Sequence, residues 1–172
     1  MDIIIDGYNL IRQSDYLRRF ERQSLEAGRL NLINQLSRYQ RIKGHKITVV
    51  FDGWESGGVS EERDRQGGID IIYSRRGEKA DDVIKRIAGN SSGELIVVSS
   101  DREIVSFVTR RSKTALSSPE FELIMMKAGA STDFFPPGKK IGEEDMRPAG
   151  KKGPSRRLPK AARRLRTKIT KL

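Results

Sequence analysis

The chain has 172 residues, a hydrophobic share of 35% and a formal net charge of +11 at pH 7, which suits one domain of ordinary size with a basic appendage. It contains no cysteine and a single histidine, His45, which excludes disulfides, thiolate metal sites, a cysteine nucleophile and multi-histidine zinc sites, and fits a reducing compartment. No apolar run approaches the roughly 20 residues of a membrane-spanning helix. The first residues are typical of a strand rather than a signal peptide, so we expect neither feature.

The positive charge is concentrated toward the end of the chain. Residues 136–172 hold 13 Lys/Arg against 3 Asp/Glu, whereas residues 1–135 hold 21 against 20. We therefore expect a nearly neutral domain at 1–135 and a basic, flexible tail at 136–172. Such a tail is typical of an arm that binds RNA or another polyanion, and a solvated end without a partner is the alternative. Apolar residues spaced from Leu158 to Ile169 predict a short amphipathic helix in the tail, without the aromatic anchor that a membrane would favour.

The first predicted element is a strand of three isoleucines, residues 3–5, which runs directly into Asp6 and Gly7. A β-branched run without polar alternation is typical of a strand buried on both faces, as in a parallel sheet covered by helices. The glycine permits a tight turn that places Asp6 at the strand's C-terminal end, where open α/β sheets bind ligands. The alternative is that Asp6 only starts a turn and caps the next segment.

Further strands alternate with helices along the domain. One long helix after Ser24, with Gly44 as a stop, is predicted by apolar residues that recur at helical spacing along one face: Leu25, Leu32, Ile33, Leu36 and Tyr39. Ser117 and Glu120, with a proline between them, indicate the start of the last helix. In order we expect a loop with a short helical turn at 10–23, a helix at 25–43, strands at 46–51 and 69–73 separated by a loop at 54–68, a helix at about 80–88, a strand at 95–98, a helix at 102–110, a strand at 114–116 and a helix to about 129. This alternation predicts an α/β fold, a mostly parallel sheet with helices on both faces.

Acidic residues follow the strands. Asp6, Asp52 and Asp101 each end a predicted strand, and Asp81 and Asp82 open the helix after the third one. Because the carboxyl ends of parallel strands meet at one edge, we expect several of these aspartates to share a site. The alternative for Asp81 and Asp82 is that acidic residues in the first turn only stabilise the helix. Clustered carboxylates repel one another, and Mg²⁺ or Mn²⁺ would remove that penalty. Such a site suits hydrolysis of a phosphodiester bond.

Other chemistries fit the sequence less well. The chain has no P-loop, no Gly-x-Gly-x-x-Gly after a strand, no Asp-x-Asp at the end of the first strand and no Gly-x-Ser-x-Gly elbow, which argues against the nucleotidases, dinucleotide-binding proteins, phosphatases and hydrolases that use them. We expect Mg²⁺ or Mn²⁺ to be held by Asp6, Asp81, Asp82 and Asp101, with Asp52 in a supporting place. We expect Asn9, Ser99 and Ser100 to support the site by hydrogen bonding to the carboxylates, a bound water or the substrate.

Four segments together resemble a known family: Ile-Ile-Ile-Asp6-Gly-Tyr-Asn9, Val-Val-Phe-Asp52-Gly, Ala-Asp81-Asp-x-Ile and Val-Val-Ser-Ser-Asp101. Over residues 1–130 the chain is similar to the NYN domain family, more closely its YacP-like branch within the PIN-like ribonucleases. The resemblance implies a three-layer α/β/α fold and a metal-dependent endoribonuclease with acidic ligands at Asp6, at Asp81 or Asp82, and at Asp101. It also implies cytoplasmic RNA processing or decay, including action on ribosome-bound mRNA. The chain departs from the pattern after the fourth strand, where a further acidic residue often follows Asp101: here Arg102 comes next, and Glu103 is the candidate substitute for that residue.

Basic residues are the expected contacts to RNA. We expect the following arginines to attract its backbone: Arg12, Arg75, Arg76 and Arg102 near the site, and Arg156, Arg157, Arg163 and Arg164 in the tail. Solvated surface charge is the alternative for each. The competing hypothesis for the whole chain is an RNA- or ribosome-binding adaptor with a PIN-like fold and no catalysis. A phosphatase acting on small phosphate esters is a third reading, in which the basic tail has no evident use.

Overall fold

The computed structural model describes residues 1–53 and 59–130, so the expected tail at 136–172 lies outside the described residues. At its centre is a six-stranded sheet in the order β3-β4-β2-β1-β5-β6. The strands are β1 (Asp2–Asp6), β2 (Lys46–Phe51), β3 (Glu62–Gln66), β4 (Ile69–Tyr73), β5 (Leu95–Val98) and β6 (Thr114–Leu116). Within the described part of the chain, β3 alone runs antiparallel to its neighbour, and the other pairings are parallel. The carboxyl ends of the parallel strands therefore share one edge of the sheet.

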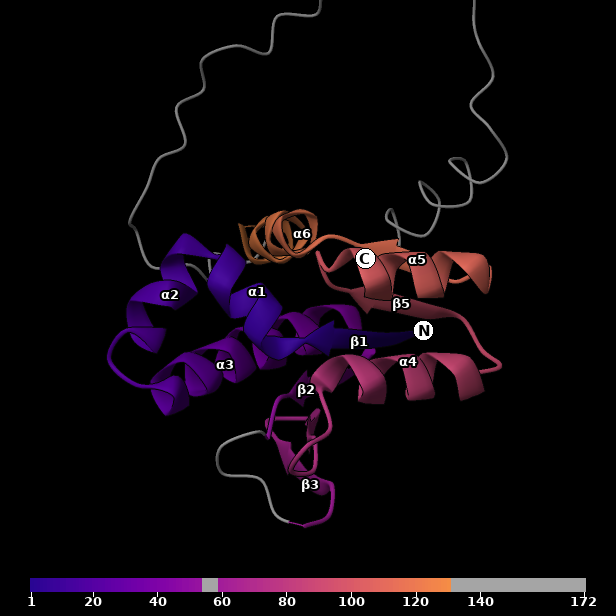
Figure 1. Cartoon of the computed structure of the whole chain (residues 1–172). Coiled ribbons are helices and arrows are strands. Elements are labelled where there is room, and N and C mark those ends of the chain that lie inside the picture. Colours follow the sequence, from indigo (N-terminus) through magenta and orange to yellow (C-terminus); the bar gives the residue numbers. More distant parts are fainter. Residues whose placement is uncertain (54–58, 131–172) are drawn as a thin grey trace, which may run out of the picture.

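Helices cover both faces of the sheet (Figure 1). They are α1 (Gly7–Gln13), α2 (Asp15–Glu21), α3 (Leu25–Lys43), α4 (Ala80–Asn90), α5 (Arg102–Arg110) and α6 (Ser118–Ala130). One core lies between the sheet and α1, α2, α3 and α6, and the second lies between the sheet and α4 and α5. This is the three-layer α/β/α arrangement that the sequence predicts.

The opening strand shows why an unbroken apolar run is needed here. Ile3 and Ile5 are fully buried in the first core, whereas Ile4 is buried in the second. Successive side chains of a strand point to opposite faces, so a central strand covered on both sides has no position for a polar residue. The interpretation of residues 3–5 as a doubly buried strand is confirmed.

The expectation of a loop at residues 10–23 was wrong, because most of this segment is helical. α1 and α2 each have a local side-chain cap: the Asp6 carboxylate accepts a hydrogen bond from Asn9 N, and Ser14 Oγ accepts one from Leu17 N. The segment buries only a few apolar side chains among many arginines. Capping and the contacts of α2 with α3 stabilise helices whose apolar periodicity is too sparse to be recognised.

The expected loop at 54–68 was also wrong in part, because residues 62–66 form β3. All five residues of β3 are exposed, so the strand carries no hydrophobic alternation. It pairs with β4 through a two-residue turn at Gly67 and Gly68, whose φ angles are 59° and 87°. Positive φ at both positions is what a type I′ hairpin requires. Residues 54–58 lie outside the described part of the chain.

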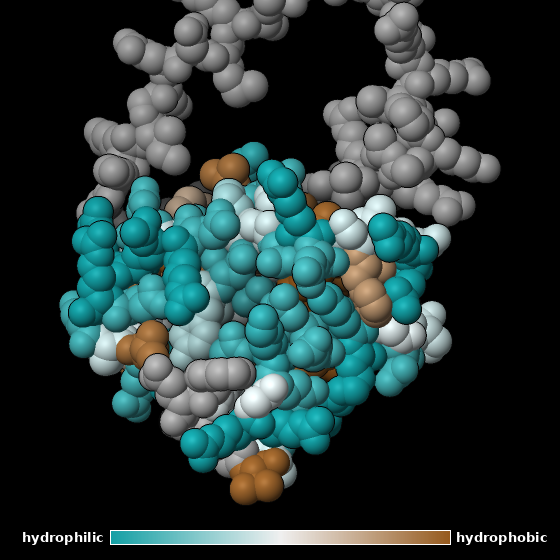
Figure 2. All heavy atoms as spheres, in the orientation of Figure 1, coloured by the Kyte–Doolittle hydropathy of each residue, from teal (hydrophilic) through white to brown (hydrophobic). Residues whose placement is uncertain are grey.

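The surface in view is mostly hydrophilic, with hydrophobic residues scattered over it (Figure 2). Leu25 was expected on the buried face of its helix but is 44% exposed, whereas Leu32, Ile33 and Leu36 are buried as expected. The described helices include none whose length and apolar character would let it cross a membrane.

Candidate acidic site

Asp6 is a buried carboxylate at the end of β1, only 8% exposed. Its Oδ1 accepts a hydrogen bond from Asn9 N at 3.1 Å, and its Oδ2 accepts one from the Ser99 hydroxyl at 3.2 Å. The first bond caps α1. The capping role that the sequence suggests for Asp6 is therefore real, and it holds the carboxylate at the carboxyl edge of the sheet.

The environment of Asp6 disfavours its negative charge. The pKa of Asp6 is raised from its ordinary value of 3.8 to about 6, chiefly by burial and to a smaller extent by the charges of Asp81 and Asp52. The hydrogen bonds from Asn9 and Ser99 oppose this rise without cancelling it. Asp6 is thus a carboxylate whose ionised form lacks a compensating positive charge.

Asp81 lies close enough to three other aspartates for their negative charges to act on it. It is half-buried in the first turn of α4, and burial, followed by the charges of Asp101, Asp52 and Asp82, raises its pKa. Lys85, one turn further along α4, has the opposite effect. Asp82 is exposed, and Asp81 rather than Asp82 is the member of the pair whose charge acts on Asp6.

Asp52 and Asp101 each hold the start of a helix. Asp52 Oδ1 accepts a 2.7 Å hydrogen bond from Ala80 N at the start of α4, whose own N-cap residue, Lys79, makes no side-chain capping bond. Asp101 Oδ1 accepts from the backbone N–H groups of Glu103 and Ile104, at 2.7 and 3.3 Å, and so caps α5. These bonds place both carboxylates at the same edge as Asp6.

Three predicted supporting residues form one hydrogen-bond network. Ser99 Oγ donates to Asp6 and accepts from Asp101 N at 3.1 Å, so it links the two carboxylate positions. Asn9 Oδ1 accepts from Ser100 N at 3.0 Å and from the Ser118 hydroxyl at 2.8 Å. Asn9 therefore ties the start of α1 to the loop after β5 and to α6, a structural task that occupies its side-chain oxygen.

Ser118 is a member of this network that the sequence pattern did not reveal. It is fully buried, and its backbone N donates to Ser100 Oγ at 3.2 Å. Its position two residues after the last parallel strand was the available signal, because segments that follow such strands lie at the same edge. The sequence marks this serine only as part of a helix start.

The four predicted arginines of the domain do not converge on one place. Arg12 pairs with Glu21 at 3.3 Å, and Arg75 pairs with Glu78 at 3.2 Å. Arg75 and Arg76 line one hollow together with Asp82. Arg102 lines a different groove, which runs along α5. The tail arginines Arg156, Arg157, Arg163 and Arg164 lie outside the described residues.

The donor chemistry of the edge suits a hard divalent cation, since it consists of carboxylate, amide and hydroxyl oxygens. The arrangement is nevertheless open: among residues 1–53 and 59–130, no three acidic or histidine side chains gather closely enough to hold a metal ion. The residues fit Mg²⁺ or Mn²⁺ in kind, and any such ion would need oxygens from elsewhere to complete its shell.

A mostly parallel sheet between two helical layers, with carboxylates at the edge where its strands end, defines a PIN-like α/β/α protein. The family model described as "YacP-like NYN domain" matches residues 3–163. The chain belongs to this family, which confirms the resemblance drawn from the four motif segments.

Similar proteins occur in Bacillus subtilis. Protein YacP is 31% identical over 105 residues, which cover 59% of this chain and 61% of YacP, so the match spans less than two thirds of that relative. The crystal structure of Rae1 (YacP) superposes with a TM-score of 0.64 at 22% identity, covering 77% of this chain and 78% of that one. The crystal structure of a Rae1 mutant gives the same TM-score, and the superposition covers 77% of this chain and 79% of the mutant chain. These structures establish the shared fold.

Proposed function

We propose that the protein is a metal-dependent endoribonuclease that hydrolyses phosphodiester bonds in RNA. The observation that carries the proposal is Asp6, a buried carboxylate with a pKa raised to about 6 and flanked by Asp81 and Asp52. A site that holds negative charges together in low polarity is poorly stable by itself, and a divalent cation supplies the missing positive charge. Membership of the YacP-like NYN family supports the same assignment.

Each acidic residue has a defined part in this proposal. Asp6 and Asp81 are the principal candidate ligands of Mg²⁺ or Mn²⁺, and Asp101 and Asp82 are candidates beside them. When bound, the cation would lower the pKa of a water molecule and neutralise charge on the phosphate. Ser99 holds Asp6 and the backbone of Asp101 in register. Because these side chains supply few ligands, a bound Mg²⁺ would also need oxygens from water and from the substrate.

The basic residues provide the affinity for RNA in this proposal. Arg12, Arg75, Arg76 and Arg102 lie on the domain, and the tail at 136–172 contributes a further net charge of +10. Contacts of this kind attract the phosphate backbone without reading its sequence, so binding should weaken steeply with salt. The cellular setting we propose is the cytoplasm, with RNA decay or processing on the ribosome as the task.

The test is cleavage of an end-labelled RNA with and without Mn²⁺, by the wild type and by Asp6→Asn and Asp101→Asn. Both substitutions keep a side-chain oxygen that can cap the following helix, so they remove charge with little loss of structure. Asp64→Asn, on exposed β3, is the matched control for loss of one carboxylate. Cleavage by the wild type and the control, and its loss in the two site variants, is expected. Activity that survives both substitutions would contradict the proposed site.

A second function, an RNA- or ribosome-binding adaptor without catalysis, is favoured by a different observation. Asp52 and Asp101 already cap helices, and no metal-binding group of three acidic side chains exists in the described residues. Metal-independent RNA binding with no cleavage of any RNA, ribosome-bound mRNA included, would support the adaptor. Deletion of residues 136–172 then separates the roles: cleavage that persists unchanged assigns the tail to localisation rather than to capture of the substrate.

A further inference from the structure

A groove whose lining includes none of Asp6, Asp52, Asp81 and Asp101 runs along α5 on the side of α4. Its volume is about 450 Å³, and its walls come from one residue of α4 and from residues along α5 and just beyond its end. The lining residues are Lys85, Arg102, Glu103, Ser106, Phe107, Arg110 and Arg111. The span from Arg102 to Arg110 is about 12 Å at the rise of an α-helix, so the groove is elongated rather than a point-like pocket.

The charge of the groove is strongly positive. Four of its side chains are cationic, and its one carboxylate, Glu103, is already paired with Lys85 at 3.0 Å. Within the described residues, Arg102, Arg110 and Arg111 form no ion pair, and all three are exposed. The groove therefore presents unneutralised guanidinium groups, which favour a polyanion as the occupant.

An aromatic side chain lies in the middle of this positive charge. Phe107 is half-buried, its inner side packs against the second core, and the guanidinium carbon of Arg111 lies 3.6 Å from its ring centroid. A ring stacked with a guanidinium forms a flat surface on which a nucleobase can stack. An extended polyanion without bases, such as a peptide of acidic residues, has no ring to stack on that surface.

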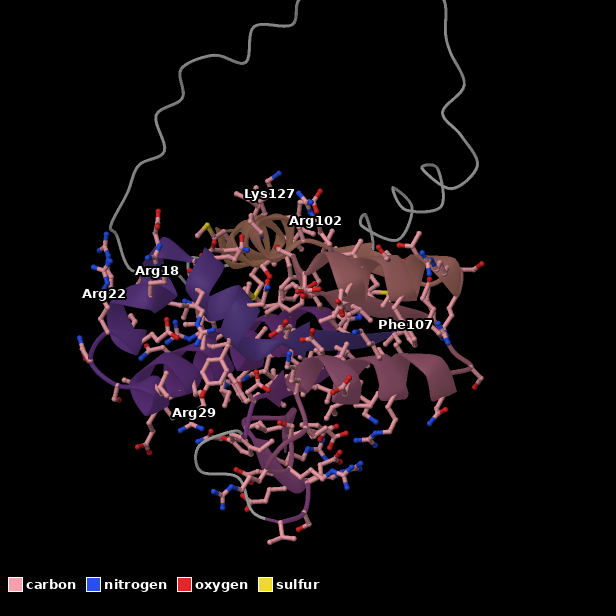
Figure 3. All side chains as sticks on the ribbon, viewed as in Figure 1. Arg18, Arg22, Arg29, Arg102, Phe107 and Lys127 are labelled. Atoms are coloured by element: carbon pink, nitrogen blue, oxygen red, sulfur yellow. The ribbon has the colours of Figure 1, made fainter. Side chains whose placement is uncertain are left out.

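The groove begins beside the acidic site. Arg102 directly follows Asp101, and Lys85 lies one turn along α4 from Asp81 and acts electrostatically on it. In Figure 3, Arg102 lies toward α6 and Phe107 lies farther along α5, on the side of α4. A strand lying in the groove therefore has one end at the carboxylates and leads away from them along α5.

We infer that this groove, lined by Arg102, Phe107, Arg110 and Arg111, binds single-stranded RNA beside the acidic site. The arginines contact successive phosphates, and a base stacks on the Phe107–Arg111 pair. The inference rests on the proposed function for its choice of substrate, and it adds the direction in which the strand leaves the site and the type of RNA that is bound. Paired RNA does not present an unstacked base to Phe107, so single strands bind preferentially.

The location of bound RNA can be tested without catalysis. Full-length Asp6→Asn protein in EDTA is irradiated with a single-stranded RNA that carries 4-thiouridine, and the crosslinked peptides are identified by mass spectrometry. Crosslinks within residues 102–111 are expected. Crosslinks confined to other segments would overturn the inference.

Affinity gives the second measurement, made by fluorescence anisotropy in the same background. Phe107→Leu keeps apolar volume but removes the ring. The double variant Phe107→Leu, Arg111→Gln should weaken binding of single-stranded RNA about five- to tenfold. Replacing Arg110 and Arg111 by glutamine should reduce the slope of log K against log salt by about 0.7 for each phosphate that the variant no longer neutralises. The charge-matched control is the double variant Arg63→Gln, Arg65→Gln on β3, at the other end of the sheet. Its affinity for RNA should equal that of the parent protein.

The outcomes separate this inference from the proposed function. If the wild type cleaves RNA with Mn²⁺ while the groove variants bind and cleave like the control, the groove inference fails and the ribonuclease proposal stands. If RNA crosslinks to residues 102–111 but the protein cleaves no RNA, the groove inference stands and the ribonuclease proposal fails. Equal loss of affinity for single-stranded RNA, duplex RNA and an acidic peptide would also overturn the inference, because it would show a general polyanion surface.

Discussion

Replacing Asp6 by asparagine should stabilise the protein at neutral pH. The pKa of Asp6 is raised from 3.8 to about 6, so the folded state holds the proton more tightly than the unfolded chain does. Ionisation of Asp6 therefore costs stability as the pH rises from about 4 to about 6, and the cost is constant above that range. At about 1.4 kcal/mol per unit of pKa, the full cost is about 3 kcal/mol.

Asparagine resembles the protonated carboxyl group in shape and charge. Its oxygen can accept from Asn9 N, and its amide can donate to Ser99 Oγ, so both hydrogen bonds of Asp6 have counterparts. We expect the wild type and the variant to be equally stable near pH 4. Above pH 6 the variant should be more stable by up to about 3 kcal/mol, or roughly 6–12 °C in melting temperature for a chain of this size.

The assay is urea or thermal unfolding at half-unit steps from pH 4 to pH 8 without divalent cations, with Asp64→Asn as the control for an exposed carboxylate. Mn²⁺ should then raise the stability of the wild type at pH 7.5 and have a much smaller effect on the variant. A variant that is less stable than the wild type at pH 7.5, or a difference that does not change with pH, would refute the reasoning from burial and like charge.

Two further predictions concern the scaffold around the site. Asp52→Ala should destabilise the protein by about 1 kcal/mol in urea unfolding, because Ala80 N at the start of α4 loses its acceptor, whereas Asp52→Asn should keep most of that stability; equal stability of the alanine variant and the wild type would contradict the cap. Gly7→Ala should cost about 1–3 kcal/mol in the same assay, because the added Cβ would overlap the buried Phe51 ring. Gly89→Ala, in open space on α4, should instead stabilise by up to about 1 kcal/mol, and a loss at both glycines would argue against the overlap.

Much of the fold was predictable because its strands are short apolar runs that end in polar residues. A doubly buried strand such as residues 3–5 admits no polar side chain, so the pattern is unambiguous. β3 has the opposite character: it lies at the edge, all its residues are exposed, and pairing of its backbone with β4 is what makes it a strand. Backbone pairing leaves no trace in the hydrophobic pattern, and only the Gly67–Gly68 pair indicated a turn.

The candidate site was predictable in outline for a topological reason. Residues that follow parallel strands lie at one edge whatever their separation in sequence, and this brought Asp6, Asp52 and Asp101 together. The difference between Asp81 and Asp82 was not predictable, since it depends on which face of α4 is turned to the sheet. Nor did the sequence indicate that Ser118 would donate to Asn9, because that contact joins residues 109 positions apart.

The most direct measurement of the central claim is a crystal structure of the protein soaked with Mn²⁺, with anomalous scattering used to locate the ion. We predict a peak at ligand distance from carboxylate oxygens of Asp6 and Asp81, which is absent in crystals of Asp6→Asn soaked in the same way. No peak at this edge of the sheet, at a Mn²⁺ concentration that supports RNA cleavage in solution, would contradict the assignment of the acidic edge as the metal site.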